Sequence, residues 1–438
     1  MPHLKDAPTD FVGILKQLGP GLIISASIVG SGELIVTTKL GADVGFTLLW
    51  FIIFGCLIKV FLQVELGRYA ILSGKTMLQA IDGVPGPRLL VSWLVWVWIC
   101  MFVATFFQVS GMVGGIAQAV SLSGLQFSNT TLALAITGSC ALLLFIGRYT
   151  FVERFSTVMV AGFTLFTILA VLSLYWTDYG VSAADLAEGM SFGLTDDFTI
   201  AFAAFGVIGV GASELIYYPY WCLEKGYARF VGRDDQSDAW QKRAKGWIRV
   251  LQWDAFASMV IYTGATIAFY LLGAAVLHGK SVEVSNDNLM ASLSHLYSES
   301  FGVVGLWIFI FGAIAVLYST VFIATASNGR LAADLLQLFG LAKTASEERR
   351  GQLIRYSCVA LPVIYCVFYL TLGRPVTLVT IGAVAQALML PFLGYAALYF
   401  LYRRTAEVMK PGKVWFAFLW ISSMLMGAVG IYQLSRMF

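Results

Sequence analysis

Eleven stretches of mostly apolar residues, each long enough to cross a membrane as a helix, constrain the fold of this chain more than any other feature. A helix of about 20 apolar residues spans the hydrocarbon core of a bilayer. Of the 438 residues, 59% are hydrophobic and only 12% are charged, which excludes a soluble globular domain. We therefore predict a polytopic all-α membrane protein. The predicted spans are residues 19–42, 45–70, 90–120, 130–147, 154–176, 198–223, 250–277, 301–328, 353–371, 375–402 and 414–435.

One short phrase occurs twice, in the first and in the sixth predicted span. Residues 29–35 read VGSGELI and residues 210–216 read VGASELI. Each phrase holds one carboxylate, Glu33 or Glu214, with glycines just upstream, and clustered glycines weaken a helix. We predict that both helices are broken near the middle of the membrane, with the acid at the start of the second half. Paired interrupted spans are typical of a transporter binding site.

The two phrases lie five spans apart, so the second copy enters the membrane upside down relative to the first. This predicts an inverted repeat of five plus five helices with an eleventh helix appended. The expected parts are a cytoplasmic tail (1–18), a first repeat (19–176), an extracellular loop (177–197), a second repeat (198–402), and a cytoplasmic connection with the eleventh helix (403–438).

Lysine and arginine are distributed unevenly between the two sets of connections. With a cytoplasmic N-terminus, the outer connections hold only four basic residues, Lys39, Lys280, Arg374 and Arg436. The positive-inside rule therefore predicts an N-terminus inside and a C-terminus outside, in the cytoplasmic (inner) membrane. A net charge of +3 is too small to indicate nucleic acid as a partner. We expect a monomer whose partners are the lipid bilayer and a small cationic substrate.

Glu33 and Glu214 are the first candidates for a functional site. An ionised acid at the bilayer centre costs several kcal/mol unless it is paired or hydrated. Each carboxylate could instead only cap the half-helix that follows it. Two converging carboxylates, freed backbone carbonyls and the hydroxyls of Ser31 and Ser213 would form a shell of oxygen atoms. Hard cations such as Mg²⁺ or Mn²⁺ prefer such ligands, so we predict a metal site between Glu33 and Glu214.

Lys59 lies near the middle of the second span, too far from either end to reach water easily. It could form a buried ion pair or be neutral. It could also be a fixed or titrating cation that replaces a coupling ion, or a partner of Glu33 or Glu214.

We expect the substrate to be bound by residues at the two breaks and in the tenth span, namely Gly30, Ser31, Glu33, Gly211, Ser213, Glu214 and Gln386, and we expect Lys59, Gln108 and Arg355 to couple transport or compensate charge. Gln386 in the tenth span and Gln108 in the third are candidates for the site, although a lone glutamine in a span commonly joins two helices. Arg355 stands at the start of the ninth span, where a cytoplasmic anchor is expected.

Several segments resemble the Nramp family of divalent-metal transporters, as a divergent branch of it. GPGLIISASIVGSGELIVTTKLGADVGFTLLW resembles the first span of the family and LIKVFLQVELGRYAILSGK the second. GRYTFVERF, TASNGRLAADLL and AQALMLPF resemble parts of its fifth, eighth and tenth spans. The resemblance implies a LeuT-type fold with eleven or twelve helices that takes up Mn²⁺ or Fe²⁺ with protons.

The resemblance also shows where this chain departs from the metal site of the family. The first-span motif DPGN corresponds to residues 30–33, so Gly30 replaces the metal-binding aspartate and Glu33 the asparagine. The sixth-span motif MPHN corresponds to residues 211–214, so Gly211 replaces the thioether ligand and Ser213 the histidine.

The other functional positions of the family also differ here. Its tenth-span glutamine ligand falls at Ala383, one turn before Gln386, and its third-span acidic pair falls near Gln108 and Gly111. Arg355 corresponds to an arginine of the proton path of the family.

These features lead to three hypotheses. The first is a secondary transporter that binds a hard divalent metal, Mg²⁺ or Mn²⁺, and works by alternating access. The second is a transporter of a small organic cation or zwitterion, with Lys59 balancing one glutamate. The third is a non-transporting receptor on the same fold. We expect no resident cofactor and no enzyme activity, because the sequence shows no nucleophile–base pair, nucleotide-binding loop or histidine-based catalytic set.

Overall fold

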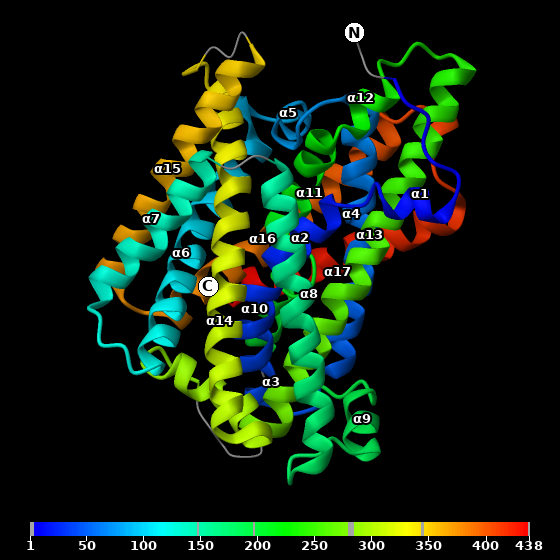
Figure 1. The fold of residues 1–438 in the computed structure, drawn as a ribbon. Helices are drawn as coiled ribbons and strands as arrows, with labels where there is room; N and C mark the ends of the chain where they lie inside the picture. Colours follow the sequence, from blue (N-terminus) through cyan, green and yellow to red (C-terminus); the bar gives the residue numbers. More distant parts are fainter. Residues whose placement is uncertain (1–3, 147–148, 196–197, 279–283, 343–345, 437–438) are drawn as a thin grey trace.

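The computed structural model describes residues 4–146, 149–195, 198–278, 284–342 and 346–436 (Figure 1). Helices make up almost all of the regular structure in these ranges. The exception is a short antiparallel hairpin of β1 (Arg88–Leu89) and β2 (Val91–Ser92). The all-α prediction is therefore confirmed.

The helices follow one another in chain order as described next. The first half holds α1 (Phe11–Leu15), α2 (Pro20–Ile28), the π-helix η1 (Val29–Thr37), α3 (Thr38–Val44), α4 (Leu49–Ser73), α5 (Met77–Asp82), α6 (Trp93–Leu122), α7 (Asn129–Ile146), α8 (Tyr149–Ser173), the 3₁₀-helix η2 (Leu174–Trp176) and α9 (Ala183–Gly189). The second half holds α10 (Thr199–Phe205), α11 (Ala212–Lys225), α12 (Tyr227–Val231), α13 (Asp238–Leu272), the π-helix η3 (Gly273–His278), α14 (Leu289–Leu338), α15 (Glu347–Leu372), α16 (Pro375–Arg403), the 3₁₀-helix η4 (Glu407–Met409) and α17 (Lys413–Ser435).

Each of the eleven predicted spans coincides with helical structure. Within the described part of the chain, nine helical segments are long and apolar enough to cross a membrane. The fifth predicted span is α8 with η2, of which the described apolar part is Thr164–Trp176. The sixth is divided between α10 and α11, so neither piece alone reaches the length of a span.

The two repeated phrases interrupt their helices in different ways. In the second phrase the chain leaves the helix after α10 and re-enters it at α11, and Gly209 between them has a φ of +59°, which favours glycine. Glu214 then lies in the first turn of α11, as predicted. In the first phrase the chain instead continues as the π-helix η1, so Glu33 lies inside a helix and the prediction that it starts a second half-helix is wrong. A π-helix retains backbone hydrogen bonds, which join residues i and i+5.

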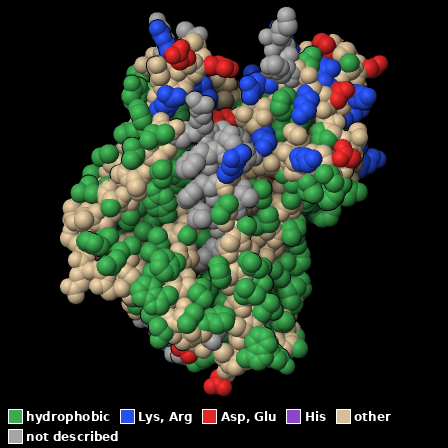
Figure 2. Space-filling model, in the orientation of Figure 1, with side chains coloured by type: hydrophobic (Ala, Val, Ile, Leu, Met, Phe, Trp, Pro, Cys, Tyr) green, Lys and Arg blue, Asp and Glu red, His purple; other side chains and the backbone are tan. Residues whose placement is uncertain are grey.

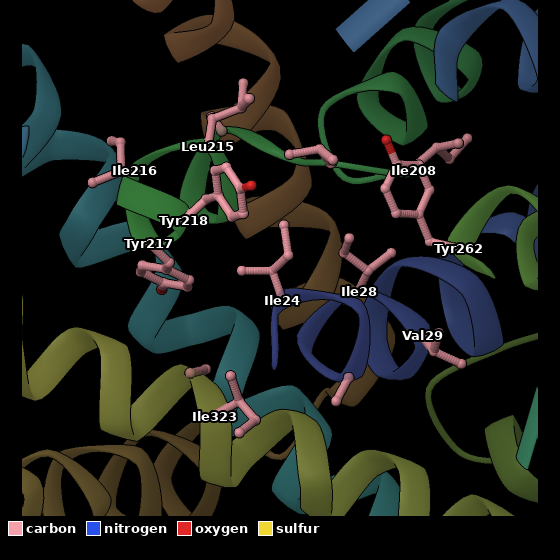
Figure 3. Close-up of a cluster of buried hydrophobic side chains, with 14 of the residues drawn as sticks. Ile24, Ile28, Val29, Ile208, Leu215, Ile216, Tyr217, Tyr218, Tyr262 and Ile323 are labelled. Carbon is pink, nitrogen blue, oxygen red and sulfur yellow. The ribbon is translucent and has the colours of Figure 1, made fainter. Parts of the chain in front are cut away.

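Helix α2, which begins the first predicted span, lies at the centre of the molecule. It contacts α8, α11, α13 and α14, and its residues from Ile23 to Ile28 are buried. Figure 3 shows Ile24 and Ile28 of this helix in one apolar cluster with Leu215 of α11 and Ile208 of the unwound segment. The two interrupted helices are thus packed against each other.

The outer surface divides into a charged end and an apolar belt. On the face that Figure 2 shows, lysine, arginine and acidic side chains gather at the end that holds α5 and α12. Apolar side chains cover much of the surface below this end (Figure 2). Exposed large apolar side chains include Leu142 on α7 and Phe311 on α14. α9 lies at the opposite end from α5 and α12 (Figure 1). This pattern fits a multi-pass protein in a lipid bilayer.

A buried carboxylate of α13 caps the N-terminus of α2. Asp254 accepts hydrogen bonds from Gly19 N at 2.8 Å and from Gly21 N at 2.7 Å, and Tyr218 Oη donates to it at 3.0 Å. The first amide groups of a helix have no partner within the helix. Asp254 therefore satisfies two of them from a helix far away in sequence.

Asp254→Asn should lower the free energy of unfolding by about 1–3 kcal/mol, because the amide keeps the volume but cannot accept hydrogen bonds at both of its polar atoms. Thermal unfolding of the purified protein in detergent measures the change. Asp238→Asn, at an exposed position on the same helix, is the matched control and should change stability by less than about 0.5 kcal/mol. Equal effects of the two changes would contradict the capping role.

Candidate functional site

Glu214 joins α11 to α2. Its Oε1 accepts a hydrogen bond from Ser27 Oγ at 2.9 Å, and its side chain is buried with 8% exposed. Because Glu214 lies in the first turn of α11, its carboxylate also lies near amide groups that the helix leaves unpaired. Ser27, on α2, was not predicted as a site residue, since a serine in an apolar helix usually bonds to its own backbone.

Gln386 of α16 connects the second break to a third helix. Its Oε1 accepts a hydrogen bond from Ser213 N at 2.9 Å, and its Nε2 donates to Gln108 Oε1 at 2.8 Å. Gln108 lies on α6, and all three residues are buried. The structure therefore brings Gln386, Gln108 and Ser213 together.

Three oxygen atoms converge beside Gly211, which lacks a side chain. A Cβ atom on Gly211 would lie 2.6 Å from Gln386 Oε1, 2.7 Å from Glu214 Oε2 and 2.9 Å from Gly206 O. One oxygen comes from a carboxylate, one from a carboxamide and one from the unwound backbone. This group, which we call the Gly211 oxygen cluster, concentrates negative charge in a buried place. A cation or a hydrogen-bond donor would be stabilised there.

Glu33 binds the same unwound segment through different partners. Its Oε1 accepts a hydrogen bond from Gly209 N at 3.1 Å, and its Oε2 accepts one from Thr37 Oγ1 at 2.8 Å. The side chain is completely buried. Glu33 and Glu214 thus make hydrogen bonds to separate groups. Both oxygens of Glu33 are already engaged within the protein.

Lys59 also binds the unwound segment. Its Nζ donates to Phe205 O and to Ile208 O, the latter at 2.6 Å, and lies 4.3 Å from the centre of the Phe205 ring. The side chain is fully buried. The hydrogen bonds of Lys59 therefore go to backbone carbonyls and not to a carboxylate, although Glu33 and Glu214 are close enough to interact with it electrostatically.

The structure places the remaining candidates elsewhere. Gly30 faces α14, where its Cβ would lie 1.9 Å from Thr320 Oγ1. The side chain of Ser31 lies outside the described residues. Arg355 is exposed and lines a separate cavity of about 1090 Å³, together with residues such as Glu224 and Arg330. Gly30 is therefore a packing position, and Arg355 lies apart from the two glutamates.

A buried polar chain extends from the second break toward α15 and was missed in the sequence. Tyr217 Oη donates to Asn328 Oδ1 at 2.6 Å, and Asn328 Nδ2 donates to Tyr365 Oη at 3.2 Å. The available signal was Asn328, an amide within the apolar run of α14. Tyr217 lies one turn after Ser213 on α11, so this chain begins beside the site.

Comparison with solved structures shows the fold to which this arrangement of helices belongs. A mutant of the Eremococcus coleocola manganese transporter covers 99% of this chain and 89% of its own, with a TM-score of 0.71 and 17% identity. Inward-facing Mhp1 (TM-score 0.54, 16% identity, 99% of this chain and 92% of its own) and MhsT with L-phenylalanine (TM-score 0.56, 13% identity, 98% of this chain and 100% of its own) share the fold. The chain thus has the LeuT-type transporter fold.

The family follows from the sequence match. Residues 21–436 match the model of the natural resistance-associated macrophage protein-like (Nramp) proteins, and the chain belongs to this family. Uncharacterized protein PM0681 of Pasteurella multocida is 23% identical over 331 residues, or 73% of this chain and 70% of that protein. Divalent metal cation transporter MntH of Yersinia pestis is 22% identical over 59% of this chain and 60% of its own length, which is less than two thirds. Nramp membership makes the chain a transporter and not an enzyme.

Gly30→Ala should destabilise the protein by about 1–3 kcal/mol, because the added methyl group overlaps Thr320 and forces η1 away from α14. Thermal unfolding in detergent measures the loss. Gly264→Ala on α13 is the control, since nothing lies within 4 Å of its added Cβ. It should be neutral or stabilise the protein by up to about 1 kcal/mol. Equal unfolding temperatures of the two variants would show that Gly30 does not pack closely against Thr320.

Proposed function

We propose that the protein carries a hard divalent metal cation, Mn²⁺ or Mg²⁺, across the membrane by alternating access. The Gly211 oxygen cluster is the observation that carries this proposal. It brings Glu214 Oε2, Gln386 Oε1 and Gly206 O within 2.9 Å of one point, the position that a Cβ atom on Gly211 would occupy. Carboxylate, carboxamide and backbone oxygens are the donors that hard cations select.

The choice of metal follows from the donor atoms. The oxygen cluster contains no thioether or imidazole, so nothing in it favours a softer metal over Mg²⁺ or Mn²⁺. The names of the similar proteins, divalent metal cation transporter MntH and a manganese transporter, support Mn²⁺. Because a carboxylate and two neutral oxygens are a small ligand set, the cation would retain water molecules, as Mg²⁺ commonly does.

The roles of the two glutamates separate under this proposal. Glu214 supplies an oxygen to the cluster and is a metal ligand. Glu33 is a positioning residue, because its two oxygens bind Gly209 N and Thr37 Oγ1 and thereby hold the unwound segment that presents Gly206 O. In this proposal Glu214 binds the metal directly and Glu33 does not, whereas the sequence predicted a metal bound between Glu33 and Glu214.

We also propose the orientation expected from the basic residues. The charged end with α5 and α12 would face the cytoplasm and α9 the outside, with the N-terminus inside and the C-terminus outside. The membrane would be the cytoplasmic (inner) membrane, and the working unit a monomer.

A second candidate substrate is a small organic amine or zwitterion. A primary ammonium group has three N–H donors and no acceptor, which matches three converging oxygens. In addition, the described residues contain no group of three or more histidine, cysteine, aspartate and glutamate side chains that could hold a metal ion. Calorimetric titration with Mn²⁺, Mg²⁺ and a series of small amines separates the two candidates. Binding of any of these ligands without flux in proteoliposomes would instead indicate a receptor.

Glu214→Gln should abolish Mn²⁺ binding in calorimetry and Mn²⁺ uptake into proteoliposomes, because the neutral amide removes the negative charge of the cluster. Loss of only an outer-shell partner of a metal ligand typically costs about 10-fold to 100-fold in affinity, so loss of the ligand charge itself should cost at least as much. Glu348→Gln, at an exposed acid on α15, should bind and transport like the unchanged protein. Full-affinity Mn²⁺ binding by Glu214→Gln would exclude this site.

Gly211→Ala tests the Gly211 oxygen cluster without changing any charge. The added methyl group would occupy the point on which the three oxygens converge, so Mn²⁺ affinity should fall by about tenfold or more while the protein stays folded. Gly427→Ala on α17, where nothing lies within 4 Å of the added Cβ, is the control and should bind normally. Unchanged affinity of a folded Gly211→Ala protein would show that the cation binds elsewhere.

A further inference from the structure

Lys59 occupies a position that resembles a cation site built from backbone. Its ammonium group is fully buried and donates to two carbonyl oxygens, Phe205 O and Ile208 O. The ring of Phe205 lies 4.3 Å from Nζ and adds a cation–π contact. Carbonyl groups released from a helix are the type of ligand that broken membrane helices offer to monovalent ions.

Lys59 and Glu33 bind neighbouring backbone groups of the same unwound segment. Glu33 binds Gly209 N, one residue beyond the carbonyl of Ile208 that Lys59 holds. Gly32 of η1 approaches the same segment so closely that its Cβ would lie 2.7 Å from Val207 O. Residues 205–209 are therefore held between a lysine and a glutamate, with the cation on the carbonyls and the anion on an amide.

The carbonyl groups of this segment are divided between two sites. Phe205 O and Ile208 O point to Lys59, whereas Gly206 O belongs to the Gly211 oxygen cluster. The same short stretch of backbone thus serves a covalently attached cation on one side and the proposed substrate on the other. A charge that is tethered to α4 cannot leave with the substrate.

We propose that Lys59 is a built-in cation of the transport cycle, so that the substrate moves without a co-transported monovalent cation or proton. The ammonium group holds residues 205–208 in the unwound conformation and compensates the charge of Glu33. Glu214 is then the one carboxylate left to bind the substrate. This inference rests on the proposed function for its transport arm, but its binding arm needs no metal.

The binding arm measures thermal unfolding of the purified full-length protein in choline, sodium or potassium chloride at equal ionic strength. The unchanged protein should unfold at the same temperature in all three salts, because Lys59 already fills the site. Lys59→Gln should unfold at a lower temperature in choline and recover part of the loss in Na⁺ or K⁺, since an ion that binds only the folded state stabilises it. Lys39→Gln, which removes a partly exposed lysine paired with Asp43, should show no such dependence.

The transport arm measures Mn²⁺ uptake into proteoliposomes in the same salts and with a protonophore. Uptake by the unchanged protein should not depend on Na⁺, K⁺ or a proton gradient. Lys59→Gln should lose about tenfold or more of its uptake in choline and regain part of it with Na⁺ or K⁺.

Three results would overturn the inference. They are a dependence of the unchanged protein on Na⁺, K⁺ or protons, full uptake by folded Lys59→Gln in choline, and a folded Lys59→Gln that neither Na⁺ nor K⁺ stabilises. If Lys59→Gln does not fold, the ion dependence of the unchanged protein decides. If the unchanged protein transports no Mn²⁺, the proposed function fails, and the unfolding measurements still test the role of Lys59.

Discussion

The backbone between α10 and α11 can remain unwound inside the membrane only because other groups satisfy its polar atoms. In a bilayer each unpaired amide or carbonyl costs several kcal/mol. Lys59 supplies donors to Phe205 O and Ile208 O, and Glu33 supplies an acceptor to Gly209 N. Without these two side chains the segment would have to form a helix, and Gly206 O would then bond within that helix. The site therefore depends on a buried lysine and glutamate that need not touch the substrate.

The same arrangement explains how so many ionisable groups are tolerated in an apolar interior. The positive charge of Lys59 lies near both Glu33 and Glu214, so the three side chains together carry one net negative charge when all are ionised. The proposed divalent cation would change this net charge from −1 to +1, whereas a monovalent ammonium group would neutralise it. A carboxylate that is buried and incompletely compensated is a functional feature more often than a structural one.

The sequence predicts the number and order of the helices well, because runs of apolar residues have few alternatives in a membrane. It also predicts that Glu214 begins a half-helix, because glycines cluster just before it, and in the structure Glu214 lies in the first turn of α11. The sequence could not show that the first phrase forms a π-helix, because clustered glycines permit both unwinding and a wider helix. The position of Gln386 beside Gly211 depends on the rotation of α16 against α11, which no local pattern determines.

Asp254 and Lys59 together link the two repeats in a reciprocal way. Lys59 belongs to α4, the second long helix of the first repeat, and holds the end of α10 in the second repeat. Asp254 belongs to α13, the second long helix of the second repeat, and holds the beginning of α2 in the first. The charges have opposite signs because one binds carbonyls and the other binds amides. Neither α2 nor α10 can move away from its partner helix without breaking a buried charged contact. The movements of α2, α4, α10 and α13 are therefore coupled.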